Sequence, residues 1–134
     1  MRKMEIGSEE IMYDFNFTNV YRDKYNKQCM CEECINFRTH FYNRYEEVAL
    51  FINQFGININ YPLEIVDCGI DDEKNKREYI AYYLVKGTLS TSQIHKKIEN
   101  VDLIFFNPDE IKNKYSNSDM KKPYFIIEIS KLYI

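Results

Sequence analysis

The amino-acid sequence predicts an α+β fold in which one long helix in the N-terminal half packs on a mainly antiparallel sheet of four to five strands. Apolar residues recur at helical spacing from about residue 32 to residue 55, and several later segments have strand-like patterns. Helices and strands do not alternate along the chain as they would in βαβ units. The 134 residues are 45% hydrophobic and 29% charged, which is typical of a globular chain, and we expect a single domain over residues 1–134.

The first predicted element is a half-buried strand over residues 11–17, in which apolar and more polar side chains alternate with a period of two. The apolar positions of this pattern are Ile11, Tyr13, Phe15 and Phe17. A polar loop over residues 18–28 follows and leads to a group of cysteines.

The long helix is predicted from about Glu32 to Phe55. Its apolar residues are separated by steps of four, four, three, four and three residues, so they share one helix face. These positions are Phe37, Phe41, Tyr45, Val48, Ile52 and Phe55. Such a helix would be about 36 Å long, and Gly56 stands where a left-handed C-terminal cap is expected. We expect this apolar face to be buried against the sheet.

The other strands are predicted after the helix, in segments that are rich in β-branched and aromatic residues. Residues 89–100 have no clear preference, and the proline followed by acids at the start of residues 108–114 predicts a short helix there. The four predicted strands are residues 63–68, 79–85, 101–106 and 124–129.

Charge and hydropathy exclude several functional classes. The chain has 18 Lys and Arg against 21 Asp and Glu, and this net charge of -3 provides no overall field that would attract nucleic acid. No apolar run approaches the roughly 18 residues that cross a bilayer, so we expect no membrane association. Acidic residues follow the first basic residues before the apolar part of a signal peptide could form. We therefore expect a soluble, cytoplasmic protein whose cysteines are reduced.

Three cysteines within six residues, Cys29-x-Cys31-x-x-Cys34, are the most distinctive feature of the sequence. Zinc prefers four nitrogen or sulfur ligands in a tetrahedron, and closely spaced cysteines allow one short segment to supply several of them. If the helix begins near Glu32, Cys31 lies at its N-cap and Cys34 lies in its first turn. The positive end of the helix dipole then favours the thiolates that a metal requires. The pattern predicts a structural zinc site.

Cys68 is the preferred candidate for the fourth ligand, because it ends a predicted strand that folding can bring to the other cysteines. His40 lies six residues after Cys34, which on a helix is a net rotation of about 240° and a rise of about 9 Å, so these two side chains point apart. His95 is distant in sequence and lies in the segment without a clear assignment. Two alternatives remain open, namely four reduced cysteines without a metal, and a redox or iron–sulfur role. The predicted ligand set is Cys29, Cys31, Cys34 and Cys68.

No pattern of catalytic residues is recognisable. The sequence has no glycine-rich phosphate loop, no G-x-S-x-G elbow and no H-E-x-x-H motif. The helix geometry that separates His40 from Cys34 also excludes the two as a base and its nucleophile. We therefore predict no catalytic residue and no residue that binds an organic cofactor.

Three motifs follow one another between residues 21 and 66. They are Cys29-x-Cys31-x-x-Cys34-x-Asn36-Phe37, a helix that closes on Phe55-Gly56-Ile57, and Pro62-Leu63-Glu64-Ile65. This combination resembles a group of small bacterial proteins that have no established activity. Some members are similar to small partner or immunity proteins of bacterial toxin systems, so the resemblance implies a protein partner and no particular functional residue.

The leading functional hypothesis is a non-enzymatic, cytoplasmic protein-binding domain of the immunity or accessory type, with a structural zinc site. The compact acidic composition, the 12 tyrosines and the lack of a catalytic pattern favour it. The alternative hypothesis is a thiol-dependent redox enzyme or a metal-dependent enzyme centred on the cysteine cluster.

Overall fold

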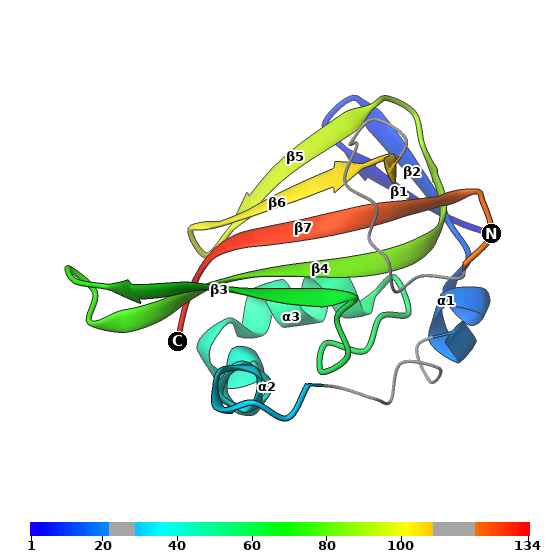
Figure 1. Ribbon diagram of the computed structural model, residues 1–134. Coiled ribbons are helices and arrows are strands. Elements are labelled where there is room, and N and C mark those ends of the chain that lie inside the picture. Colours follow the sequence, from blue (N-terminus) through cyan, green and yellow to red (C-terminus); the bar gives the residue numbers. More distant parts are fainter. Residues whose placement is uncertain (22–28, 109–119) are drawn as a thin grey trace.

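The computed structural model describes residues 1–21, 29–108 and 120–134 (Figure 1). These residues form a seven-stranded sheet, in which every neighbouring pair of strands is antiparallel, and three short helices. The strands are ordered β1-β2-β4-β7-β6-β5, and β3 pairs separately with β4. In chain order the elements are β1 (Arg2–Ile6), β2 (Glu9–Tyr13), α1 (Phe15–Tyr21), α2 (Glu32–Arg44), α3 (Glu46–Asn53), β3 (Glu64–Asp71), β4 (Lys76–Leu89), β5 (Gln93–Ile98), β6 (Val101–Phe106) and β7 (Tyr124–Tyr133).

β4 is the central strand, because it is long enough to pair with three others. Along one edge it pairs with β7, with Leu84 opposite Ile126. Along its other edge the N-terminal half pairs with β3 and the C-terminal end pairs with β2. A Cβ atom on Gly87 would lie 2.1 Å from the carbonyl oxygen of Met12, so the glycine allows the backbone of β2 to approach β4.

The main core lies between the sheet and the two helices α2 and α3, which cover one of its faces (Figure 1). The rings of Phe37 in α2 and Tyr79 in β4 have centroids 5.5 Å apart. Phe55, which follows α3, contacts Phe105 of β6 at 5.9 Å and Phe125 of β7 at 6.2 Å. All five side chains are fully buried, and burying one such ring contributes roughly 1.5–3 kcal/mol. This packing positions the N-terminus of α2 against β4.

The prediction of one long helix over residues 32–55 is wrong, because α2 and α3 are separated at Tyr45, whose φ of -135° and ψ of 57° are not helical. The Tyr45 hydroxyl donates to the carbonyl oxygen of Tyr133 at 3.2 Å and accepts from its N–H at 2.8 Å. These bonds fix the break to the end of β7. The Glu99 carboxylate accepts from the N–H of Val48 at 3.0 Å, which caps the start of α3. The predicted apolar face is nevertheless retained, since its fully buried members are Phe37, Phe41, Val48, Ile52 and Phe55.

The α+β class is compatible with this structure, but the sheet exceeds the predicted four to five strands. β1 was not predicted, and β5 lies in the segment without an assignment. β5 forms because Glu99 and Asn100, with φ values of 53° and 62°, make a two-residue turn that folds it onto β6.

The boundaries of other elements also differ from the prediction. The strand predicted over residues 11–17 ends at Tyr13, because the Asp14 side chain accepts from the N–H of Phe17 at 2.9 Å and begins α1. β6 coincides with the predicted strand, whereas β3, β4 and β7 are longer than predicted. The helix predicted over residues 108–114 lies outside the described residues, apart from residue 108. None of the three described helices is long and apolar enough to cross a membrane.

Candidate metal centre

Three of the four predicted ligands come together at the N-terminus of α2. Cys31 is the N-cap residue, with extended backbone angles of -67° and 159°, and Cys34 lies in the first turn. The Sγ atoms of Cys29, Cys31 and Cys34 all lie within 4.8 Å of one another. A tetrahedral zinc ion with Zn–S bonds of about 2.3 Å requires its sulfur atoms to be about 3.8 Å apart. The three Sγ atoms therefore need to move closer together by at most about 1 Å to bind zinc. The three cysteines could therefore hold a metal ion.

The surroundings of the three thiols differ. Cys29 and Cys31 are exposed, and Cys34 is half-buried. The pKa of Cys29 is lowered, first because the backbone N–H of Cys31 donates to its sulfur and then because the two other thiols do so. Burial, followed by hydrogen bonding to Cys31 and Cys29, raises the pKa of Cys34 to about 12. A metal ion would have to displace the Cys34 proton, so binding should release protons.

Arg38 lies one helical turn after Cys34 and connects α2 to the segment before it. Its Nη2 donates to the carbonyl oxygen of Cys29 at 2.7 Å and lies 3.6 Å from the sulfur of Met30. Its Nη1 is buried and has no hydrogen-bond partner within the described part of the chain. The guanidinium charge also favours the thiolate of Cys29. Arg38 therefore places a positive charge beside a group that becomes anionic when it binds a metal.

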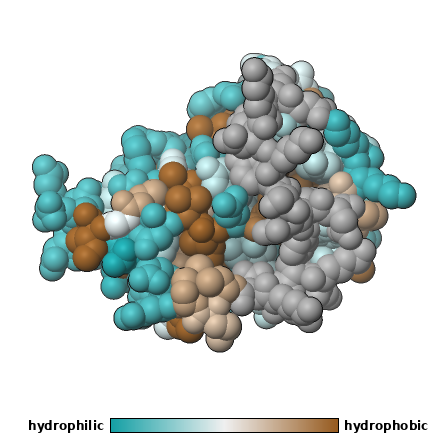
Figure 2. Space-filling model, in the orientation of Figure 1, coloured by the Kyte–Doolittle hydropathy of each residue, from teal (hydrophilic) through white to brown (hydrophobic). Residues whose placement is uncertain are grey.

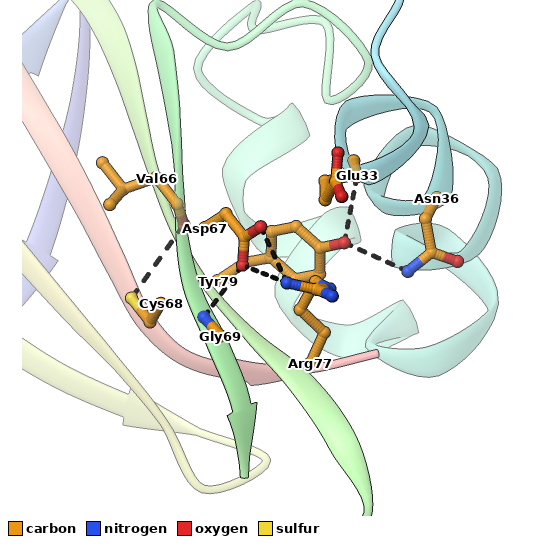
Figure 3. Close-up of polar contacts among 8 residues, drawn as sticks. All are labelled: Glu33, Asn36, Val66, Asp67, Cys68, Gly69, Arg77 and Tyr79. Carbon is orange, nitrogen blue, oxygen red and sulfur yellow. Dashed lines mark hydrogen bonds and ion pairs between the residues drawn. The ribbon is translucent and has the colours of Figure 1, made fainter.

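The first turn of α2 is anchored to the sheet by Tyr79, a fully buried residue of β4 (Figure 3). The Tyr79 hydroxyl donates to the carbonyl oxygen of Glu33 at 2.9 Å and accepts from the side-chain amide of Asn36 at 3.1 Å. Beside it the Arg77 guanidinium binds both carboxylate oxygens of Asp67, at 2.9 and 2.8 Å. These contacts with the core fix the position of the helix end that carries Cys34.

Cys68 does not belong to the group of three. It lies on β3, is exposed, and its sulfur is 4.0 Å from the carbonyl oxygen of Val66 (Figure 3). Both histidines also stay apart from the cluster. His40 lies in α2, and His95 lies on β5, where its Nε2 is 3.2 Å from the side-chain oxygen of Gln93. Every cysteine and histidine of the chain is among the described residues, so the structure gathers only three of these six side chains.

Sequence reasoning missed two residues that shape this centre. Arg38 stands four residues after Cys34, a spacing that places both side chains on one side of a helix, so the sequence contained a signal for it. Tyr79 is separated from Glu33 by 46 residues, and only the packing of α2 against β4 brings them together.

Comparison of the chain with models of known protein families, with curated proteins and with solved structures found no match. The resemblance to the group of bacterial proteins with the same cysteine spacing therefore stays a prediction, and function has to be argued from the geometry of the centre.

Proposed function

We propose that the protein is a zinc-binding domain in which Cys29, Cys31 and Cys34 are the protein ligands. The observation that carries the proposal is the mutual approach of three sulfur atoms to within 4.8 Å at one helix N-terminus. The ion would join the segment before α2 to the helix itself, and its role would be structural rather than enzymatic. Metal binding requires reduced thiols, so the proposal includes a reducing compartment such as the cytoplasm.

Charge and ligand type support zinc over other ions. Three thiolates and Zn²⁺ have a net charge of -1, which the single positive charge of Arg38 offsets. Zinc also accepts sulfur ligands in a tetrahedral arrangement and needs no redox partner.

The test is elemental analysis of protein that has been purified without a chelator. We expect about one equivalent of zinc, loss of the zinc in Cys34→Ser, and retention in Cys68→Ser. The second variant is a matched control, because Cys68 is an exposed cysteine outside the cluster. Zinc and iron below about a tenth of an equivalent, with all four thiols open to titration, would overturn the proposal.

We further propose that the protein is a non-enzymatic binding domain of the immunity or accessory type, and that it binds its partner protein along β3. β3 pairs with β4 by one edge, and no described strand pairs with its other edge. Ile70 of β3 is 62% exposed, and Figure 2 shows a hydrophobic patch over the far end of the β3–β4 hairpin within a hydrophilic surface. Unpaired strand edges are surfaces to which an extended segment of a partner can add.

The partner hypothesis is tested by co-expression with the protein encoded by the adjacent gene, followed by size-exclusion chromatography. We expect a complex that Ile70→Glu abolishes. Leu50→Glu should leave it intact, because Leu50 is equally apolar and 50% exposed but lies on α3. Separate elution of the wild-type chains, or equal effects of the two variants, would contradict a binding surface on β3.

A further inference from the structure

We infer that the zinc ion takes its fourth ligand from outside the chain, and that this ligand is a thiolate. The inference rests on the proposed zinc site. The sequence predicted a closed site in which four cysteines fill every position on the zinc. Three cysteines leave one position on the zinc at which ligands can exchange.

The first reason is the count of soft ligands. The chain has four cysteines and two histidines, and all six are described. Only Cys29, Cys31 and Cys34 form a metal-binding group, while Cys68, His40 and His95 lie elsewhere in the fold. Among the described residues no histidine, cysteine or carboxylate completes this group, so tetrahedral zinc lacks a fourth ligand from the described part of the chain.

The second reason is access. Cys29 and Cys31 are exposed, and Met30 between them is 73% exposed, so the outer side of the cluster faces solvent. Cys34 supplies the inner, half-buried sulfur. An external ligand can therefore approach the ion past the exposed Cys29 and Cys31 without displacing any of the buried core.

The third reason is charge. A fourth thiolate brings the zinc centre to a net charge of -2. The Arg38 guanidinium stands beside Cys29, with the Nη1 hydrogens buried and unpaired within the described residues. The positive end of the α2 dipole, equivalent to roughly half an elementary charge, points at the same group. Together these positive charges, about 1.5 elementary charges, offset most of the total charge of -2.

The binding step is a ligand exchange. A thiol displaces water from the zinc, so a Zn–S bond forms, a Zn–O bond breaks, and the thiol proton passes to the solvent. Coordination to zinc keeps the incoming sulfur as a thiolate at neutral pH. The same chemistry serves a small thiol or a cysteine of a partner protein, and the two sources are distinguished by experiment.

The test uses the full chain loaded with Co²⁺ in place of zinc, in the presence of a phosphine reductant. Sulfur-to-cobalt charge-transfer absorbance reports the number of Co–S bonds. Titration with 2-mercaptoethanol should raise this absorbance by about a third and saturate, as expected when three Co–S bonds become four. Ethylene glycol, the oxygen analogue, should have no such effect, and Cys68→Ser should behave as the wild type. A response to a cysteine-containing peptide but not to 2-mercaptoethanol would support the same position with a protein as the source.

The outcomes separate this inference from the zinc proposal. If the wild type shows no charge-transfer band, or if Cys34→Ser keeps the wild-type band, the zinc proposal itself fails. A wild-type band that thiols do not change means that the chain fills the fourth position, and this overturns the inference while the zinc site stands. A band that falls by about a quarter in Cys68→Ser identifies Cys68 as the fourth ligand and also overturns it.

Discussion

Tyr79→Phe removes a single buried hydroxyl and tests whether the position of the α2 N-terminus depends on it. The hydroxyl donates to the carbonyl oxygen of Glu33 at 2.9 Å and accepts from the Asn36 amide at 3.1 Å. The ring is fully buried and would remain in place, so the change affects only these two bonds. Each hydrogen bond contributes about 0.5–1.5 kcal/mol net, and we expect a loss of about 1–2 kcal/mol because Asn36 is half-buried and can bind water instead.

Two measurements check this magnitude. For a chain of this size, about 1–2 kcal/mol corresponds to a fall of about 4–8 °C in the thermal midpoint. Hydrogen exchange should show the lost protection in the first turn of α2, and the β6–β7 pairs should keep theirs. Tyr42→Phe is the matched control, because Tyr42 lies on the same helix and is 44% exposed. A midpoint for Tyr79→Phe within about 1 °C of that control would refute the reasoning.

Three further predictions concern the core, the sheet and pH. Phe41→Ala should destabilise the fold by about 3–5 kcal/mol, because Phe41 is fully buried, and an unchanged midpoint of denaturant unfolding would contradict this. Gly87→Ala should release β2 from β4, because its Cβ would lie 2.1 Å from the Met12 carbonyl oxygen, and NMR should show loss of the β2–β4 amide contacts while those of β6–β7 stay. Partial burial of Asp67 favours its neutral form, but hydrogen bonds from Arg77 and the charge of Arg77 outweigh it and lower its pKa below the ordinary 3.8. The stability from Asp67 is therefore present above about pH 4 and is lost as the pH falls through the lowered pKa, so unfolding of Asp67→Asn should depend less on pH below about 4.

The apolar face of residues 37–55 shows what the spacing of apolar residues can predict and what it cannot. Phe37, Phe41 and Ile52 are buried as their spacing predicts, whether the helix is continuous or broken. The spacing does not predict the break in the helix at Tyr45, because the break depends on hydrogen bonds to Tyr133, which is 88 residues away.

The strands also divide into those that a local pattern predicts and those that depend on distant contacts. The strand over residues 101–106 has a pattern strong enough to be placed correctly. β1 and β5 carry charged residues on an exposed face, and they become strands because their neighbours offer unpaired backbone groups.

The sequence by itself predicted the buried helix face and the three neighbouring thiols, because each depends on residues within a few positions of one another. The predicted α+β class is compatible with the structure, although the single long helix is not. The tertiary structure decided the number of strands, the break in the helix and the membership of the metal centre. Cys68 lies 34 residues after Cys34, and no local pattern reports the distance between such positions. That distance follows from the pairing of β3 with β4 and from the packing of α2, and these leave Cys68 on an exposed strand outside the cluster.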